Sequence, residues 1–213
     1  MRLSADDIKN IFAKDSLDGD DEFYDEDEEG EFNRSCEQAA KKIKLIALDV
    51  DGVLTDGTIY IGNEGEVFKG FNAKDGMGIS CALRSGIKVV IITGRKSEII
   101  RRRAEELRIT TVLEGVHDKE AALKQLLRQN KLRLEQAAYI GDDLNDLAPM
   151  LSCGLSFAPA DAALDALDVA DFVLLNDGGR GAVREAIELI LMSQDKWDDI
   201  VQAYSEGGQG DRQ

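Results

Sequence analysis

The sequence predicts an α/β protein with a Rossmann-like parallel sheet, helices on both faces and a small β-hairpin insert. Three observations lead to this fold class. Short runs of β-branched and aliphatic residues alternate along the chain with segments of helical periodicity, which is typical of βα units. The mostly apolar run Leu45–Asp49 is typical of a strand buried on both faces. Polar side chains follow several of these runs, at the edge where α/β sheets bind ligands.

Composition limits the class of protein. The chain has 213 residues, 43% hydrophobic and 32% charged, which suits one soluble domain with a core. Its net charge of −16 disfavours nucleic acid and anionic membranes as partners, and no apolar run approaches the ~20 residues of a membrane span. The three cysteines form no C-x-x-C pair, so we expect free thiols and a cytoplasmic protein. A single histidine, His117, excludes a zinc site built on a histidine cluster.

The charge is unevenly distributed. Residues 1–40 carry a net charge of −10, and residues 41–213 carry −6. A segment so rich in acids cannot bury enough apolar surface to fold. We therefore expect a largely disordered acidic tail over residues 1–40, one folded domain over residues 41–197 and a flexible tail over residues 198–213.

The predicted elements follow in order after the first strand. Thr58–Ile61 and Glu66–Lys69 are short β-like runs around Gly62-Asn-Glu-Gly65, which predicts a hairpin. Phe71-Asn-Ala-Lys-Asp-Gly76 leads into a helix that ends at Leu83. Hydrophobic patterns predict the remaining elements. The strands are Ile87–Thr93, Thr110–Leu113, Ala137–Ile140, Gly154–Phe157 and Asp171–Leu175, and the helices are Ser97–Leu107, Lys119–Gln129 and Gly181–Met192.

Two acids end the first core strand. Asp49 and Asp51 stand one residue apart and are followed at once by Gly52. Side chains at positions i and i+2 of an extended chain project to the same side, so these carboxylates repel one another unless a cation lies between them. A hard divalent ion with oxygen ligands fits this requirement.

Similar polar groups stand at other strand ends and helix starts, and in a parallel sheet all of these lie at one edge. In chain order they are Asp49 and Asp51, Thr93, Lys119, and the acidic run Asp142, Asp143 and Asp146. Carboxylates, a hydroxyl and an ammonium suit phosphate chemistry, in which positioning and charge neutralisation supply most of the catalysis. Mg²⁺ prefers such oxygen ligands, and a carboxylate can attack phosphorus to form an aspartyl-phosphate.

These residues, in this order, resemble the four motifs of the haloacid dehalogenase-like phosphatases. The matching stretches are Asp49-Val-Asp51-Gly-Val-Leu-Thr, Thr93-Gly94, Lys119 and Gly141-Asp-Asp-x-x-Asp146. A second set resembles, more narrowly, the family of 3-deoxy-D-manno-octulosonate 8-phosphate (KDO 8-phosphate) phosphatases. It consists of Asp56-Gly-x-Ile-Tyr, the hairpin, Phe71-Asn-x-x-Asp75-Gly, Ile92-Thr-Gly-Arg95 and Gly178-Gly-Arg180-Gly-Ala-Val-Arg-Glu185.

The resemblance covers roughly Lys42 to Trp197 and implies a Mg²⁺-dependent phosphomonoesterase. Its expected reaction releases the sugar acid and phosphate in the synthesis of a lipopolysaccharide precursor. Asp49 would be the nucleophile that carries the aspartyl-phosphate, and Asp51 the general acid and base. Because Asp49 attacks when ionised and Asp51 first donates a proton, their environments must separate their pKa values. Thr93 and Lys119 would hold the phosphoryl oxygens.

The resemblance also implies a set of metal ligands. Mg²⁺ would be held by the side chains of Asp49 and Asp142 and by the backbone carbonyl of Asp51. Asp143 and Asp146 would orient this site without binding the ion. The sequence leaves open which of these two acids contributes more.

For the sugar acid, the resemblance implies contacts from Asn72, Ala73, Lys74, Asp75, Gly76, Gly94, Arg95 and Arg103, together with Lys119. Arginine suits bidentate capture of the substrate carboxylate. The chain departs from the pattern at Ser80, where relatives often have arginine. The missing contact would come from Lys74 or from a neighbouring subunit.

The chain lacks the large inserted cap domain of many relatives, and the hairpin alone is too small to exclude water. The resemblance therefore implies a homotetramer. In it, the hairpins would associate, and a neighbour's segment around Gly178–Arg180 would help to cover the pocket.

Three alternatives remain open. The first is the same chemistry on a nine-carbon ulosonate 9-phosphate, although such relatives tend to have glutamate where Arg95 stands. The second is a non-enzymatic phospho-switch like a response-regulator receiver domain, in which no second acid follows the phosphorylated aspartate two residues on. The third is a binding protein that acts through the acidic tail of residues 1–40.

Overall fold

The computed structural model describes residues 35–207 and confirms the predicted fold class. Six parallel strands form one sheet in the order β5-β4-β1-β6-β7-β8. They are β1 Leu45–Leu48, β4 Lys88–Thr93, β5 Thr111–Glu114, β6 Ala137–Ile140, β7 Leu155–Ala158 and β8 Phe172–Val173. The helices that follow β1 are α3 Ala73–Arg84, α4 Glu98–Glu106, α5 Lys119–Gln129, α6 Leu147–Ser152, α7 Leu164–Val169, α8 Ala182–Ser193 and α9 Trp197–Ser205. Short 3₁₀ turns are η1 Leu134–Gln136 and η2 Leu144–Asp146.

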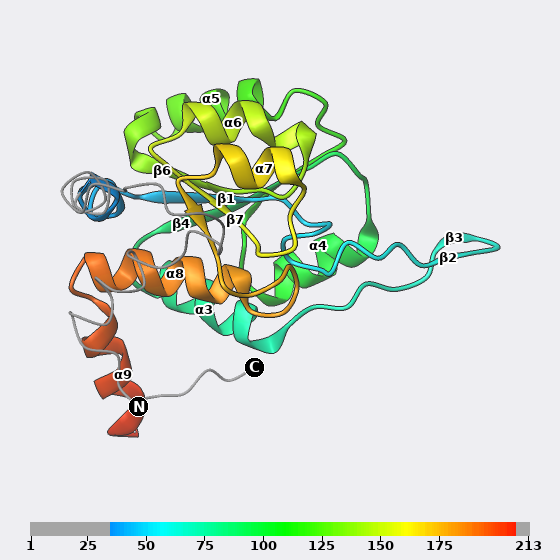
Figure 1. Ribbon diagram of the computed structural model, residues 1–213. Coiled ribbons are helices and arrows are strands. Elements are labelled where there is room, and N and C mark those ends of the chain that lie inside the picture. The colour runs from blue at the N-terminus through cyan, green and yellow to red at the C-terminus, as the bar shows by residue number, and fades with distance from the viewer. Residues whose placement is uncertain (1–34, 208–213) are drawn as a thin grey trace, which may run out of the picture.

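Side chains of β1 alternate between two hydrophobic cores. Ile46 and Leu48 face one core, which α3, α4 and α8 cover. Leu45 and Ala47 face the other core, beneath α5, α6 and α7. Figure 1 shows these two helical layers on opposite sides of the sheet. Within residues 35–207, none of the helices combines the length and the apolarity that a membrane crossing requires.

The carboxyl end of β1 lies at the centre of the sheet edge. β1 pairs with β4 on one side and β6 on the other, so that Leu48 lies opposite both Ile91 and Ile140. The chain first builds the sheet outward through β4 and β5, then returns to β6 on the other side of β1. Ligands bind at such a point of reversal in open α/β sheets.

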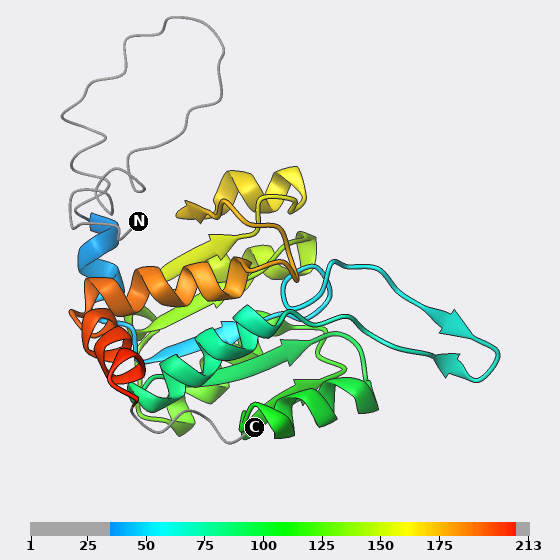
Figure 2. The same cartoon turned by 90° about the horizontal axis from the view of Figure 1, so that it is seen from below.

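The predicted hairpin is present, and it projects from the body of the protein (Figures 1 and 2). Its strands β2 (Ile61–Gly62) and β3 (Gly65–Glu66) are antiparallel and shorter than expected, because no third strand supports them. Tyr60 and Phe68 stack on one another, with ring centroids 4.1 Å apart. Several apolar side chains of the hairpin are exposed: Ile59, Tyr60, Ile61, Val67 and Phe68.

The described part of the chain extends beyond two of the predicted domain boundaries. Residues 35–40 are helical, and Cys36 and Ala40 are buried in the core, so the folded part begins before residue 41. At the other end, α9 occupies much of the expected flexible tail, and its Trp197 and Ile200 pack against the core. The helix at residues 35–40 was not predicted because the net charge was averaged over the whole acidic segment, residues 1–40. The remaining acidic segment, residues 1–34, and residues 208–213 lie outside the described residues.

Candidate active site

Asp49 directly follows β1 and is buried, with 5% of its surface exposed. Its N–H donates to the carbonyl of Ile140 at 3.1 Å, which extends the β1–β6 pairing by one residue. The chain then turns at Gly52, whose φ of +91° favours glycine. A Cβ on Gly52 would lie 1.9 Å from Oδ2 of Asp142, so only glycine lets this loop pass so close to that carboxylate.

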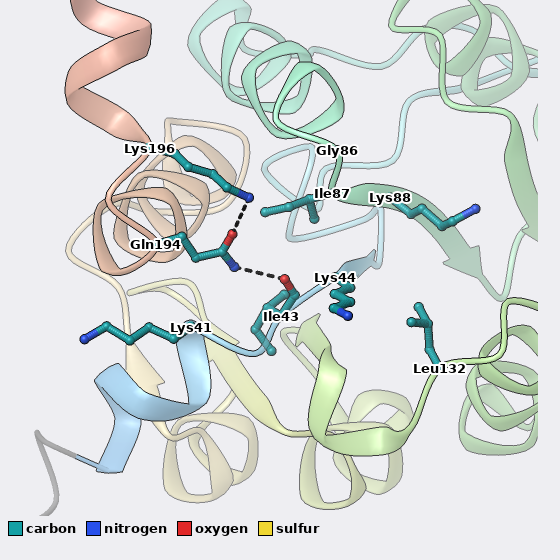
Figure 3. Close-up of a pocket in the computed structure, with 9 residues that line it drawn as sticks. All are labelled: Lys41, Ile43, Lys44, Gly86, Ile87, Lys88, Leu132, Gln194 and Lys196. Carbon is teal, nitrogen blue, oxygen red and sulfur yellow. Dashed lines mark hydrogen bonds between the residues drawn. The ribbon is translucent and has the colours of Figure 1, made fainter.

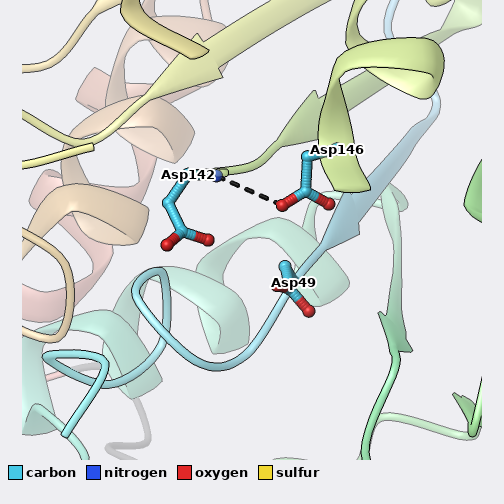
Figure 4. Close-up of side chains that lie close together, drawn as sticks. All are labelled: Asp49, Asp142 and Asp146. Atoms are coloured by element: carbon cyan, nitrogen blue, oxygen red, sulfur yellow. Dashed lines mark hydrogen bonds between the residues drawn. The ribbon is translucent and has the colours of Figure 1, made fainter. Parts of the chain in front are cut away.

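Three carboxylates gather at the ends of β1 and β6. One oxygen from each of Asp49, Asp142 and Asp146 lies within 4.8 Å of the others. Figure 4 shows the carboxylates of Asp49 and Asp142 on either side of a common space. Oδ1 of Asp142 is buried and has no hydrogen-bond partner among the described residues. This oxygen is therefore available to a ligand.

Burial and repulsion act on these acids together. Burial and the charges of Asp49 and Asp146 raise the pKa of Asp142 to about 8. Burial and the charge of Asp146 raise the pKa of Asp49 to about 6, although Lys119 opposes this rise. A hard divalent cation with oxygen ligands would relieve the repulsion and satisfy the unpaired oxygen of Asp142. The residues present therefore fit such a cation.

Lys119 and Asp146 form a buried pair beside the cluster. Lys119 is the first residue of α5, and its Nζ lies 3.0 Å from Oδ2 of Asp49 and 2.7 Å from Oδ1 of Asp146. Burial alone would lower the pKa of Lys119, but the two carboxylates raise it, so the side chain is a cation. Oδ1 of Asp146 also accepts from the Tyr139 hydroxyl at 2.6 Å, and Oδ2 accepts from the Asp142 N–H at 3.3 Å. Because both its oxygens are engaged, Asp146 supports the site instead of offering a free ligand atom.

Asp143 lies outside this arrangement. Its side chain is exposed and accepts from the N–H of Leu144 at 2.7 Å, at the start of η2. Asp146, at the end of the same short turn, is fully buried. The structure therefore favours Asp146 over Asp143 as the acid that orients the site.

We expect Asp146→Asn to reduce kcat by about 10- to 100-fold, as removal of groups that orient metal ligands does, and Asp143→Asn to change it by less than about threefold. An amide at position 146 cannot balance the charge of Lys119, whereas asparagine caps η2 as well as aspartate does. Steady-state kinetics of the two variants, with phosphate release as the readout, checks this. Equal losses in both variants would show that the two acids share the role.

Asp51 belongs to a different network from Asp49. Its Oδ1 is ion-paired with Lys69, and its Oδ2 lies 3.4 Å from Nε of Arg95. Burial alone would lower the pKa of Lys69, but Asp51 and Glu66 raise it, so Lys69 is also a cation. Thr93 ends β4 with 1% of its surface exposed, and its hydroxyl accepts from the N–H of Arg95 at 3.3 Å. The two strand-end acids thus face two different lysines.

The predicted sugar contacts at the start of α3 divide into exposed and buried residues. Asn72 caps the helix by accepting from the N–H of Lys74 at 2.8 Å, and both Ala73 and Lys74 are exposed. Asp75 is only 1% exposed, and its Oδ1 accepts from the N–H of Arg184 at 2.8 Å. Asp75 therefore joins α3 to α8 through Oδ1, while its Oδ2 is buried and has no hydrogen-bond partner among the described residues.

Arg103 and Gly76 lie together in a groove of about 830 Å³ between α3 and α4. A Cβ on Gly76 would be 2.5 Å from Nη2 of Arg103, so the glycine makes room for the guanidinium. Arg103 also lies over the ring of Phe71, 5.6 Å from its centroid, and pairs with Glu106 at 2.8 Å. Ser80 lines the same groove.

A second pocket, of about 370 Å³, lies where β1 and β4 begin, far from the carboxylates along the strands. Figure 3 shows that Lys41 and Lys88 point away from one another there, so their charges do not converge on a common ligand. Gln194 fills part of the space by donating to the carbonyls of Ala40 and Ile43 at 3.0 and 2.9 Å. We place no activity in this pocket.

Two residues of the site were not predicted from the sequence. Lys69 ended a run interpreted as a strand, yet its side chain is 1% exposed while its neighbours Val67 and Phe68 are 58% and 51% exposed. Lys69 follows two apolar residues on a short hairpin, and this sequence pattern could have identified it as a residue of the site. Tyr139 lies inside the apolar run of β6, and only the structure places its hydroxyl on Asp146.

The sequence and the fold of the chain are similar to those of known proteins. A family profile of haloacid dehalogenase-like hydrolases matches residues 111–187. The chain is 50% identical over 159 residues to the 3-deoxy-D-manno-octulosonate 8-phosphate phosphatase KdsC of Yersinia pestis, which covers 75% of this chain and 85% of that one. It is 49% identical over 160 residues to KdsC of Escherichia coli K12, with the same coverage. The phosphatase of Moraxella catarrhalis, solved with magnesium, phosphate and KDO, superposes with a TM-score of 0.78 at 40% identity and covers 80% of this chain and 98% of that one.

Proposed function

The chain belongs to the haloacid dehalogenase-like hydrolases and, within them, to the 3-deoxy-D-manno-octulosonate 8-phosphate phosphatases, and we propose that it hydrolyses this sugar phosphate through Asp49. One observation carries the proposal. The carboxylates of Asp49 and Asp142 share a cation-sized space beside the buried ammonium of Lys119. Such a site neutralises a phosphoryl group and presents a nucleophile to it.

In the first step, an oxygen of Asp49 attacks phosphorus. The bond from phosphorus to the sugar oxygen breaks, and the phosphoryl group becomes an acyl phosphate on Asp49. Asp51 donates a proton to the departing oxygen, which leaves as the C8 hydroxyl of the sugar acid. Protonation matters because a sugar alkoxide is a poor leaving group.

In the second step, Asp51 takes a proton from a water molecule as that water attacks the phosphorus of the acyl phosphate. The bond from phosphorus to Asp49 breaks, phosphate is released, and Asp49 is again a carboxylate. Lys119, 3.0 Å from Asp49, and the Thr93 hydroxyl balance charge on the phosphoryl oxygens in both steps.

The Asp49 and Asp142 side chains and the Asp51 carbonyl would hold Mg²⁺. When bound, it neutralises the two carboxylates and polarises the phosphoryl oxygens. Asp146 keeps Lys119 and the Asp142 backbone in place around these ligands. Among the described residues, no other group of at least three histidine, cysteine or acidic side chains could hold a metal ion.

The raised pKa values predict a pH-dependent response to metal. A carboxyl group whose pKa rises on folding binds its proton more tightly in the folded protein, so stability falls as the pH climbs above its unfolded value toward its folded one. For Asp49 and Asp142 the folded values are about 6 and about 8. We expect Mg²⁺, compared with a chelator, to raise the melting temperature by about 3 °C more at pH 8 than at pH 6, a difference of about 1 kcal/mol. Thermal melts of wild type and Asp142→Asn check this. If Mg²⁺ raised the melting temperature of wild type equally at both pH values, the prediction would be contradicted.

For the sugar acid we propose contacts on the side of the site where α3 and α4 begin. Arg95 is 54% exposed on its side chain and already lies beside Asp51, so it can reach a substrate carboxylate. Arg103 and Gly76 line the neighbouring groove. The proposed set is Asn72, Ala73, Lys74, Asp75, Gly76, Gly94, Arg95 and Arg103, together with Lys119 at the phosphoryl group.

We also propose a homotetramer assembled through the hairpins. The exposed apolar side chains of the hairpin, with Ile61 at 74% exposure, are a surface that association would bury. Gly178 and Gly179 pack against the loop after Asp51: a Cβ on either would lie within 2.5 Å of that backbone. These contacts lie within one subunit, so the part proposed for a neighbour's segment rests on the resemblance alone. A monomeric, fully active protein by size exclusion chromatography would remove this proposal.

The proposed setting is the cytoplasm, in the synthesis of a lipopolysaccharide precursor. Cys36, Cys81 and Cys153 form no disulfide in the structure, in keeping with a reducing compartment. The free 3-deoxy sugar acid would be the product passed on to later steps of that synthesis.

A substrate panel tests the proposed function directly. Phosphate release is measured with KDO 8-phosphate, a nine-carbon ulosonate 9-phosphate and neutral sugar phosphates, each with Mg²⁺ and with chelator. We expect the highest kcat/KM on KDO 8-phosphate, and activity only with metal. A higher kcat/KM on the nine-carbon substrate would overturn the substrate assignment. A single phosphorylation event without turnover would indicate a phospho-switch, and loss of all activity on removal of residues 1–34 would favour the tail-dependent binding protein.

A further inference from the structure

Lys69 is a buried cation at the base of the hairpin for which the proposed chemistry has no role. Its side chain is 1% exposed, although the adjacent Phe68 is half exposed. Burying an ammonium is costly unless acids compensate it. Here the compensating acids come from the hairpin itself and from the active-site loop, so the position of Lys69 depends on both.

The contacts of Lys69 form a chain into the site. Its Nζ is ion-paired with Oδ1 of Asp51 and lies 3.0 Å from Oε1 of Glu66. Glu66 in turn accepts a hydrogen bond from the hydroxyl of Ser97, which caps α4. Arg95 lies 3.4 Å from the other oxygen of Asp51. Each oxygen of Asp51 therefore has a cation partner, and of the two only Lys69 is buried.

Asp49 and Asp51 stand one residue apart, yet their carboxylates are directed to different partners. Asp49 faces Lys119, and Asp51 faces Lys69. We propose that Lys69 is the positioning residue for Asp51. It directs the Asp51 side chain toward the leaving oxygen of the substrate and away from the nucleophile, without contacting substrate itself. This inference rests on the proposed function, because it assigns Asp51 the transfer of a proton to that oxygen.

A purely structural role for Lys69, as an anchor of the hairpin, makes a different prediction. An anchor of the hairpin acts through substrate binding and therefore changes KM, whereas a positioning residue for the proton donor lowers kcat/KM most when the leaving group needs a proton and leaves KM nearly unchanged. A sugar alkoxide needs one, and 4-nitrophenolate does not. The ratio of kcat/KM values on these two kinds of substrate separates the roles, because kcat/KM reports the step in which the leaving group departs.

The experiment compares Lys69→Met, Lys69→Arg and the control Lys96→Met, an exposed lysine of the same rim. The substrates are 4-nitrophenyl phosphate and the sugar phosphate that wild type hydrolyses fastest. We expect Lys69→Met to reduce kcat/KM by about 100-fold on the sugar phosphate and by less than about fivefold on the aryl phosphate, with KM changed by less than about threefold. Arginine keeps the cation and should recover at least about tenfold of the loss on the sugar phosphate. Lys96→Met should match wild type on both substrates.

Equal losses on both substrates, no loss, or a loss confined to KM would overturn the proposal. If Lys69→Met does not fold, as judged by thermal melting, Glu66→Gln replaces it as the test variant. It keeps Lys69 and weakens its second partner, so a selective loss on the sugar phosphate supports the proposal and an equal loss on both substrates overturns it. Failure of the proposed function appears instead in wild type, as a preference for another substrate, and leaves the comparison of the two leaving groups intact.

Discussion

Asp49→Asn is expected to abolish turnover, with kcat reduced by at least about 10⁴-fold, as for loss of other catalytic nucleophiles. An amide cannot attack phosphorus to form an acyl phosphate, and it offers a metal only a neutral oxygen. The fold should survive, because burial and the charge of Asp146 already disfavour the ionised form of Asp49. The measurement is phosphate release with Mg²⁺ over hours, together with a thermal melt.

The matched control for this variant is Asp118→Asn. Asp118 lies on the same rim, is exposed, and caps α5 by accepting from the N–H of Ala121 at 2.8 Å. Asparagine caps a helix about as well, so we expect activity within about twofold of wild type. A slowly but clearly active Asp49→Asn enzyme, within about 100-fold of wild type, would mean that another group or water attacks phosphorus.

Lys119→Met is expected to reduce both activity and stability. Removing this ammonium leaves the carboxylates of Asp49 and Asp146 buried without their cation, which costs about 3 kcal/mol of unfolding free energy. It also removes a positive charge from the phosphoryl site, so we expect kcat/KM to fall by about 10³-fold. Urea denaturation and steady-state kinetics, both with saturating Mg²⁺, measure the two effects.

Lys124→Met is the control for the same substitution on the same helix. Lys124 is paired with Glu120 at 2.6 Å, but its side chain is 39% exposed, and such a pair contributes less than about 1 kcal/mol. We expect this variant to be fully active. If Lys119→Met destabilised the protein but kept its activity, Lys119 would be a structural counter-ion only, and the phosphoryl oxygens would have to be bound by other groups.

The sequence was informative where chemistry and local pattern coincide. The apolar strand that ends on Asp49 and Asp51 could be predicted because strand, turn glycine and acids are contiguous. The start of α5 at Lys119 and the bounds of β6 could also be predicted, because both elements have clear hydrophobic patterns. Since all parallel strands end at one edge, the meeting of Asp49, Lys119 and Asp142 followed from topology alone.

The remaining features depend on tertiary contacts that local patterns do not encode. Asp143 and Asp146 lie in one short motif, and only the turn η2 decides which of them is buried. Lys69 resembles a surface lysine of a hairpin until the hairpin is placed beside Asp51. Tyr139 resembles any aromatic residue of a core strand.

The short helices α6 and α7 and the C-terminal helix α9 were not predicted, and the reason here is different. α6 and α7 have six residues each, too few for helical periodicity to stand out. α9 does carry a pattern, with Trp197, Ile200, Val201 and Tyr204 at helical spacing, but it lies in a region of high polarity. Tyr204 accepts from Arg84 of α3 at 2.8 Å, which helps to hold α9 against the domain.

The stereochemical course at phosphorus tests most directly whether Asp49 carries the phosphoryl group. A monoester made chiral with oxygen isotopes is hydrolysed in isotopically labelled water, and the configuration of the phosphate product is determined. Attack by Asp49 followed by attack of water inverts phosphorus twice, so our mechanism predicts net retention. Net inversion would mean that water displaces the sugar in a single step, and the role assigned to Asp49 would be wrong.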